Sequence, residues 1–458
     1  MTASADLRLH IRHALLPDGW ADDVRVRISN GTFATVERGA ATEGDLRVGV
    51  ALPGMPNVHS HGFQRGMAGL TEFRGPAADN FWSWRTLMYQ FVARMTPDDL
   101  EAVTAQAFVD MLEGGFTRVG EFHYVHHDPD GKPYANPAEL TGRIVAAAAH
   151  TGIGLTLLPV FYAHGGFGGA PANPGQRRFL LDVPAFARLL EAARHEVRRL
   201  PHALVGVAPH SLRAVTPSQL SQVVALANGG PVHIHAAEQT GEVEQCVAWS
   251  GARPIEWLLA NAAVDGRWTM IHATHMTDDE VARLARARAV AGLCPVTEAN
   301  LGDGISQASA FLGAHGAFGI GTDSNVRISV AEELRQLEYS QRLRDRARNV
   351  VQGALPSTGR TLFDGALAGG SQSLGATSFG GVGIVAGAPA DFFSLDTDST
   401  ALFARRDDAL LDSFVFAGAN DCIDGVWRAG QQVVTGGRHV RRDEIARAYR
   451  AALERLTA

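Results

Sequence analysis

Between residues 50 and 322, short apolar segments alternate with longer stretches that carry the signals of helices. A strand followed by a helix, repeated along a chain, is typical of βα units that build a parallel sheet. The predicted strands lie at residues 50–58, 117–124, 153–161, 204–209, 231–236, 268–273, 289–294 and 317–322.

The helices between these strands have well-marked starts. Thr96-Pro97-Asp98-Asp99 and Thr216-Pro217-Ser218-Gln219 each offer an N-cap, a proline at the first helical position and a capping-box acceptor. Thr277-Asp278-Asp279-Glu280 offers the cap and the box without the proline. Strands and helices alternating over about 280 residues match a (β/α)₈ barrel, whose active site lies at the carboxyl ends of the strands. An open doubly wound sheet is disfavoured because no Gly-x-Gly-x-x-Gly follows the first strand.

Two β-patterned segments flank the predicted barrel. Residues 7–50 alternate apolar and polar positions, and residues 381–396 and 413–436 are also predicted to form short strands, through Phe414-Val415-Phe416 and Val426-Trp427. Neither flank alone buries enough surface to be stable, so we expect both ends to meet in one small β-sandwich. The predicted α/β fold is a (β/α)₈ TIM-like barrel, residues 51–380, with a sandwich from residues 1–50 and 381–458, the latter including a terminal helix.

Composition narrows the class of partner. The net charge is -7 and there is no basic block, which disfavours nucleic acid and favours a small-molecule substrate. Met1 to Arg12 contain no apolar signal core, and no apolar run approaches the ~20 residues of a membrane span. We therefore expect a soluble, cytoplasmic protein. Cys246, Cys294 and Cys422 are widely spaced, so neither disulfides nor a cysteine zinc site is indicated.

Polar side chains follow the predicted strands at the points where a barrel would gather them. Each such residue alone would be unremarkable, because a single histidine at a strand end is usually just hydrogen-bonded. The polar groups are His59, His61 and Gln64 after strand one, Glu121, His123 and Tyr124 after strand two, Tyr162 and His164 after strand three, His210 and Arg213 after strand four, His233, His235 and Glu238 after strand five, His272 and His275 after strand six, and Asp323 and Asn325 after strand eight.

Four of these groups form a candidate metal site. His59 and His61 share one face of a strand, because side chains two residues apart point the same way. With His235 and Asp323 they would supply three imidazoles and one carboxylate, a set that suits zinc or ferrous iron with water completing the shell. His233 competes with His235, since periodicity cannot separate two residues on one face.

One divalent ion per subunit is favoured over two. A binuclear version of such a site typically needs a carboxylated lysine to bridge the ions. The only lysine of the chain, Lys132, lies in Asp130-Gly131-Lys132-Pro133, a predicted turn outside the strands.

These motifs together resemble the amidohydrolase superfamily, specifically its mononuclear aminohydrolase branch. The resemblance rests on His59-x-His61, His235-x-x-Glu238, His272, Gly321-Thr322-Asp323-Ser324 and the segment from Gly383 to Asp391, which looks like the point where such chains re-enter their β-sandwich. It implies a metal-dependent hydrolase, with zinc first and ferrous iron second as the metal, and a homodimer.

Within that branch, further stretches are similar to hydrolases of linear amidines that convert N-formimino-L-glutamate to N-formyl-L-glutamate and ammonia in histidine degradation. The alternatives are a deaminase of the same superfamily that acts on a purine or triazine ring, and a non-catalytic scaffold that keeps the barrel. The stretches are Phe81-Trp82-Ser83-Trp84-Arg85, Glu121-Phe122-His123-Tyr124, Pro209 to Val215, His235 to Gln239, Leu293-Cys294-Pro295 and Glu298 to Asp303.

The resemblance also implies roles for individual residues. Asp323 would accept a proton from the attacking water, Glu238 would carry a proton to the imine nitrogen, and His272 would hydrogen-bond the attacking oxygen, with His275 as the alternative. Arginine is the best bidentate partner of a carboxylate, and the glutamyl substrate has two. The expected substrate-binding residues are Arg85 and Arg213, with Gln64, Tyr124 and His210 as further hydrogen-bonding groups.

Overall fold

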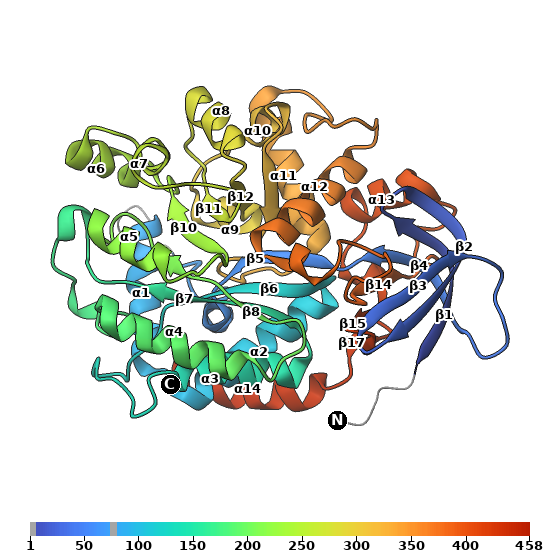
Figure 1. Ribbon diagram of the computed structural model, residues 1–458, viewed down its shortest axis with the longest axis horizontal. Helices are drawn as coiled ribbons and strands as arrows, with labels where there is room; N and C mark the ends of the chain where they lie inside the picture. The colour runs from blue at the N-terminus through green and yellow to red at the C-terminus, as the bar shows by residue number, and fades with distance from the viewer. Residues whose placement is uncertain (1–5, 74–79) are drawn as a thin grey trace.

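A ring of parallel strands forms the larger part of the molecule (Figure 1). The computed structural model describes residues 6–73 and 80–458. Isolated parallel bridges, Val207 to Val232 and Ser211 to His235, join the fourth strand position to the fifth and close the ring, which confirms the predicted barrel. The ring strands are β5 (Met55–Ser60), β6 (Phe116–His123), β7 (Gly154–Phe161), β8 (Leu204–Val205), β9 (Ala208–Pro209), β10 (Val232–Ala236), β11 (Trp268–His272), β12 (Val290–Leu293) and β13 (Ala317–Ile320).

Helices surround the ring, and the predicted capping boxes start three of them. The side chains of Thr96, Thr216 and Thr277 each accept the backbone N–H three residues on, as the sequence predicted. The helices of this part are α1 (Phe81–Arg94), α2 (Pro97–Glu113), α3 (Glu139–Thr151), α4 (Val183–Val197), α5 (Pro217–Ala225), α6 (Thr240–Ser250), α7 (Pro254–Asn261), α8 (Asp278–Arg286), α9 (Pro295–Leu301), α10 (Ala308–Gly313), α11 (Val330–Asp345) and α12 (Thr358–Ser373).

The two chain ends meet in a second sheet beside the barrel, at the right of Figure 1. Strand β4 (Leu46–Pro53) pairs with β1 (Leu7–Leu16) on one side and with β14 (Phe392–Leu395) on the other, so both ends contribute as predicted. Hydrogen bonds join all eight strands in one continuous order, with a core of their own on one face. The other strands are β2 (Gly19–Ser29), β3 (Thr32–Arg38), β15 (Ile423–Arg428), β16 (Gln431–Thr435) and β17 (Arg438–His439).

Two strand predictions were wrong in detail. Phe414-Val415-Phe416 ends a helix, α13 (Asp407–Phe416), whose buried residues Leu410, Leu411, Phe414 and Val415 repeat at helical spacing. The apolar run at 50–58 covers the end of β4 and most of β5, which belong to different sheets. Gly54 lies between them. A side chain does not fit at this position, because a Cβ there would lie 2.2 Å from Thr117 Oγ1.

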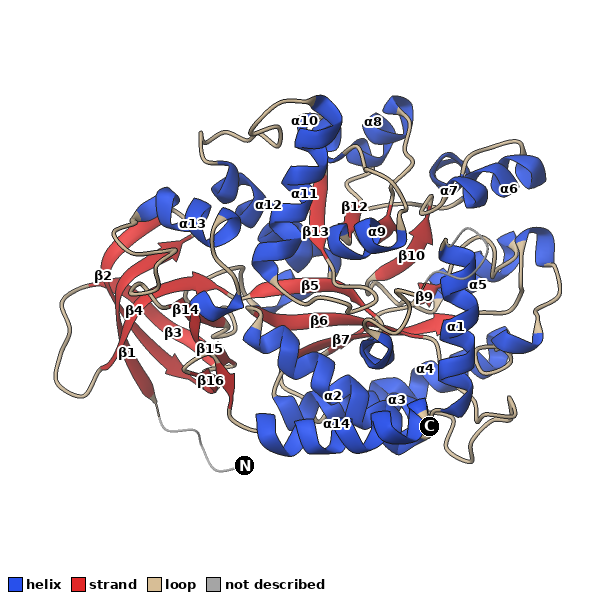
Figure 2. Ribbon diagram, turned by 180° about the vertical axis from the view of Figure 1, so that it is seen from behind, coloured by secondary structure: helices blue, strands red, loops and turns tan. Residues whose placement is uncertain are grey.

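The terminal helix α14 (Arg442–Thr457) packs on the barrel rather than on the terminal sheet. It lies beside α2 in Figures 1 and 2. Arg455 of α14 forms an ion pair with Asp99 of α2.

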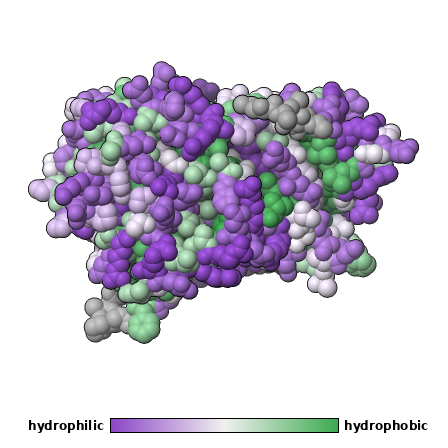
Figure 3. Space-filling model, turned by 90° about the horizontal axis from the view of Figure 1, so that it is seen from below, coloured by the Kyte–Doolittle hydropathy of each residue, from purple (hydrophilic) through white to green (hydrophobic). Residues whose placement is uncertain are grey.

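The predicted division of the chain at residues 50 and 380 stays a prediction. No helix among residues 6–73 and 80–458 is long and apolar enough to cross a membrane. The face seen in Figure 3 is mostly hydrophilic, with smaller apolar patches between.

Candidate active site

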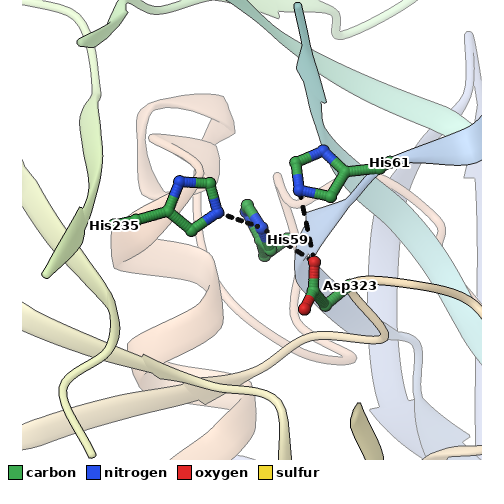
Figure 4. Close-up of side chains that lie close together, drawn as sticks. All are labelled: His59, His61, His235 and Asp323. Atoms are coloured by element: carbon green, nitrogen blue, oxygen red, sulfur yellow. Dashed lines mark hydrogen bonds and ion pairs between the residues drawn. The ribbon is translucent and has the colours of Figure 1, made fainter. Parts of the chain in front are cut away.

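The four predicted metal ligands converge at the carboxyl ends of three barrel strands (Figure 4). His59 lies near the end of β5 and His61 directly follows it, His235 lies near the end of β10, and Asp323 follows β13. His59 Nε2 and His61 Nε2 lie 3.3 Å and 3.2 Å from Asp323 Oδ1. His235 Nε2 lies 3.1 Å from His59 Nε2. One atom from each residue therefore falls within 4.8 Å of the other three.

Backbone carbonyls orient the rings of this group. His61 Nδ1 donates to Phe122 O at 2.9 Å and His235 Nδ1 donates to His210 O at 3.0 Å, which leaves both Nε2 lone pairs pointing inward. Asp323 has a φ of 42°, in the left-handed region, and is held there by hydrogen bonds between its backbone and those of His59 and His61. The loop after β13 is thus tied directly to β5.

His233, the competing ligand, lies outside this group. Its ring Nε2 donates to Ser373 O at 2.9 Å, in the barrel interior below the site. The two histidines share a face of β10, but only His235 lies next to the other three groups. The structure therefore separates two residues that periodicity could not.

The charge states of the four groups suit a divalent cation. Burial lowers the pKa of His59 to about 3 and also lowers the pKa values of His61 and His235, so all three imidazoles are neutral at pH 7. Burial alone would raise the pKa of Asp323, but the hydrogen bond with His59 and the nearby imidazoles lower it below its usual value. Three neutral imidazoles around one carboxylate are the donor set of a catalytic zinc or ferrous site.

Two predicted catalytic residues face this group. His272 Nε2 lies 3.8 Å from Glu238 Oε1 and 3.8 Å from Asp323 Oδ2. Burial raises the pKa of Glu238 to about 7. Burial would lower the pKa of His272, but the charge of Glu238 and a hydrogen bond with Glu298 raise it to about 10. The alternative, His275, turns away, because its Nε2 donates to Asp303 O at 2.9 Å.

All five predicted substrate-binding residues line one pocket with His61, His235 and Asp323 of the metal group. Gln64 Nε2 donates to Tyr124 OH at 2.9 Å, and Arg213 Nη2 lies 3.9 Å from Glu238 Oε2. Arg213 is buried, and its Nη1 has no hydrogen-bond partner among the described residues. The lining comprises His61, Gln64, Phe81, Trp84, Arg85, Met88, Tyr89, Tyr124, Tyr162, Phe179, His210, Arg213, His235, Glu238, His272, Leu301 and Asp323.

Sequence reasoning missed two buried carboxylates beside the catalytic pair. Glu298 Oε1 accepts the backbone N–H of Cys294 at 2.8 Å and lies 3.3 Å from His272 Nδ1. Glu242 Oε2 accepts the backbone N–H of Glu238 at 3.0 Å. Glu298 belongs to a stretch that carries the family resemblance, but nothing local to the sequence placed it against His272.

This barrel, with its convergent histidines and aspartate, defines a metal-dependent hydrolase. The model of the amidohydrolase family matches residues 50–433, and the chain belongs to this family. The predicted superfamily is thereby confirmed, and amidohydrolases use a divalent metal ion.

More particular similarities follow within the family. Residues 8–49 match the model described as formimidoylglutamate deiminase HutF, N-terminal domain. A formimidoylglutamate deiminase from Pseudomonas aeruginosa is 52% identical over 447 residues, covering 97% of this chain and 98% of the relative. These matches confirm the narrower resemblance, to enzymes of formiminoglutamate hydrolysis, that the sequence suggested.

Solved structures agree with the fold. The crystal structure of an amidohydrolase from Brucella melitensis has a TM-score of 0.95 and 56% identity, covering 99% of this chain and all of that one (100%). An adenosine deaminase from Xanthomonas campestris with bound zinc has a TM-score of 0.81 and 21% identity, covering 99% and 98% of the two chains. The second likeness shows the fold alone.

Proposed function

We propose that this amidohydrolase hydrolyses N-formimino-L-glutamate to N-formyl-L-glutamate and ammonia. One observation carries the proposal: a single pocket is lined by three of the candidate metal ligands, His61, His235 and Asp323, with His59 beside them, and also by Glu238, His272 and two arginines, Arg85 and Arg213. The first set suits hydrolysis of a carbon–nitrogen bond, and the arginines suit the two carboxylates of the glutamyl group. The similarity to the Pseudomonas aeruginosa deiminase supports the same substrate.

His59, His61, His235 and Asp323 are proposed to hold one divalent ion, zinc first and ferrous iron second. The fit rests on their donor chemistry and on their closeness: His59 Nε2 lies 3.1 Å from His235 Nε2 and 3.3 Å from Asp323 Oδ1, so one cation could be shared by all three side chains. Such an ion supplies Lewis-acid activation of the attacking water.

The chain's own groups are proposed to move the protons. Asp323 accepts one from the attacking water, and Glu238 delivers one to the imine nitrogen, which becomes the amino group of a tetrahedral adduct. The hydroxyl proton of the adduct then passes to the same nitrogen, the carbon–nitrogen bond breaks, and ammonia leaves as the formyl carbonyl forms. The pKa of Glu238, raised by burial to about 7, lets it hold and release a proton near neutral pH. His272, 3.8 Å from both carboxylates, hydrogen-bonds the attacking oxygen as charge develops on it.

Arg85 and Arg213 are proposed to bind the two substrate carboxylates. The buried Nη1 of Arg213 has no acceptor among the described residues, and a buried guanidinium donor without an acceptor is costly unless a ligand supplies one. Gln64, Tyr124 and His210 line the same pocket and offer further hydrogen bonds to the ligand. A flat, neutral ring would not need two guanidinium groups.

The proposed activity can be tested against the ring-deaminase alternative. Ammonia release from N-formimino-L-glutamate and from guanine is measured side by side on metal-loaded protein. We expect turnover of the first and none of the second. Turnover of guanine alone would replace the proposal with a ring deaminase, and turnover of neither by fully metal-loaded protein would favour the scaffold.

The resemblance further supports a cytoplasmic homodimer that acts in histidine degradation. The oligomeric state is tested by light scattering on the eluting protein, where a mass near twice 48.8 kDa is expected. A monomeric mass at the concentration of the activity assay would contradict the dimer while leaving the proposed reaction intact.

A further inference from the structure

One tryptophan, Trp82, contacts both arginines of the pocket. It is the second residue of α1, which lies at the end of the barrel toward which β6 and β7 run (Figure 2). The guanidinium carbon of Arg85 lies 4.5 Å from the centre of the indole, and that of Arg213 lies 5.8 Å from it. The two arginines come from α1 and from the loop after β9, so only the fold brings them to one ring.

The start of α1 and a neighbouring ring position Trp82. Asn80 caps α1 and accepts the backbone N–H of Trp82 at 2.9 Å, and the ring of Phe81 meets the indole edge-on with centroids 5.1 Å apart. A Cβ at Gly241, in the first turn of α6, would lie 3.8 Å from the indole. The indole therefore lies close to the start of α6, with little room for a side chain between them.

An aromatic ring is suited to hold two cations that must stay free to bind anions. Two guanidinium groups at one pocket repel each other, while the negative face of an indole attracts each of them. No carboxylate lies within ion-pair distance of Arg85 in the described part of the chain. Arg213 has one ion-pair partner there, Glu238 at 3.9 Å, and the charge of Glu242 also acts on it. Stacking on a ring leaves the N–H groups at the edge of a guanidinium available, whereas a carboxylate would occupy them.

We propose that Trp82 is a specificity-determining positioning residue: its indole holds Arg85 and Arg213 in the arrangement that recognises a ligand with two carboxylates. The identity of the full ligand rests on the proposed function. The positioning role itself concerns only the two guanidinium groups. It can therefore be tested with a dicarboxylate that is not a substrate.

The test measures binding of glutarate, which has two carboxylates, and of butyrate, which has one, to intact metal-loaded protein by calorimetry. For Trp82→Leu we expect glutarate to bind at least about tenfold more weakly, with a clearly smaller change for butyrate, because the loss of two cation–π contacts affects both arginines. Trp82→Phe keeps an aromatic face and should stay within about threefold of the parent protein.

Trp249 provides a matched control. It is a partly buried tryptophan of α6 that stacks on Phe167 with centroids 5.6 Å apart and has no guanidinium within cation–π distance among the described residues. Trp249→Leu should leave glutarate affinity unchanged. Metal content and the thermal unfolding midpoint of each variant show whether the fold is intact.

The outcomes separate this inference from the proposed function. Equal glutarate affinity of Trp82→Leu and the parent protein would overturn the role of Trp82, as would equal losses in Trp82→Leu and Trp82→Phe. Ammonia release from N-formimino-L-glutamate would stand untouched in that case. If Trp82→Leu binds glutarate weakly while the parent protein fails to turn over N-formimino-L-glutamate, the positioning role of Trp82 stands and the proposed substrate is refuted.

Discussion

The terminal sheet and the barrel each contain a pair of buried histidines close together in sequence, but the two pairs have different partners and different chemistry. His10 and His13 on β1 of the terminal sheet are buried, as are His59 and His61 at the end of β5 of the barrel. His10 lies 3.1 Å from Asp23, and His13 lies 2.7 Å from Asp22. The side chains of both aspartates are more than half exposed, at 62% and 57%.

The barrel pair has partners of another kind. His59 and His61 share one carboxylate, Asp323, whose side chain is 7% exposed, and His235 completes the group. In the terminal sheet His10 pairs with one solvated acid and His13 with two, Asp22 and Asp407, and such exposed pairs contribute little to stability. The chemistry of a histidine pair therefore depends on its position in the fold. Only the closed ring brings strands that are far apart in sequence to one carboxyl end.

Removal of the shared carboxylate gives the largest contrast between the regions. Asp323→Asn is expected to lose metal, and its rate of ammonia release should fall by more than about a thousandfold, because the variant lacks both a metal ligand and the proton acceptor. Asp22→Asn, which removes one of the two acidic partners of His13, should keep metal and activity. Metal analysis and the ammonia assay check both variants, and an active, metal-loaded Asp323→Asn protein would contradict the account.

Glu238→Gln should retain metal while kcat falls by about 10² to 10⁴, because the amide cannot carry the proton. The variant keeps the shape of the side chain, so its unfolding midpoint should stay close to that of the parent protein. Single-turnover kinetics and metal analysis separate lost proton transfer from lost metal. A nearly active variant would refute the role of Glu238.

Arg85→Ala should raise KM by about 10 to 100-fold with a smaller effect on kcat, because a charge-assisted contact to a substrate carboxylate is lost. Arg406, an exposed arginine that pairs with Asp22 beside the terminal sheet, is the control. Arg406→Ala should leave KM unchanged in the same steady-state assay. An unchanged KM in Arg85→Ala would move carboxylate recognition elsewhere.

Glu298→Gln should lower kcat by about tenfold with little change in KM, because the hydrogen bond that orients His272 weakens. Glu333 of α11 is the matched control. It is buried and accepts the backbone N–H of Val296 at 3.0 Å, so it contacts the same short helix, α9, as Glu298 does, but it does not contact His272. Glu333→Gln may be compared by kcat and KM at saturating metal. Equal losses in both variants would assign Glu298 a structural role only.

A smaller effect concerns stability and pH. Burial raises the pKa of Glu121 to about 8 in the folded protein from an ordinary value of 4.5. The folded state thus binds more protons between these values, and this group reduces stability progressively as pH rises from 4.5 to 8. Glu121→Gln should therefore gain in unfolding midpoint, relative to the parent protein, on going from pH 5 to pH 9. Thermal melts at both pH values check the sign, and a relative loss would contradict it.

Much of the barrel could be predicted because its signals are local. Period-two runs, capping boxes and polar groups at strand ends each lie within a few residues, and β6, β7 and β10 were predicted to within a residue or two at each end. The metal group followed from the closed ring once its strands were placed in order. The predicted roles of the site residues remain predictions that the variants above test.

The features that escaped prediction depend on contacts between distant segments. Thr117 lies so close to Gly54 that only glycine fits between β4 and β5. The helix that ends at Phe416 buries one face along its whole length, which a run of three apolar residues cannot reveal. The contact of Glu298 with His272 joins the segments after two neighbouring strands. No local periodicity encodes such a meeting.

The central claim is that the carboxyl end of the barrel holds one catalytic divalent ion. The most direct measurement is metal stoichiometry and ammonia release from N-formimino-L-glutamate in the same sample, as metal is removed by a chelator and then restored. We predict activity proportional to occupancy, saturating at one ion per chain. Full activity in metal-free protein, or activity that rises only with a second ion, would contradict the claim.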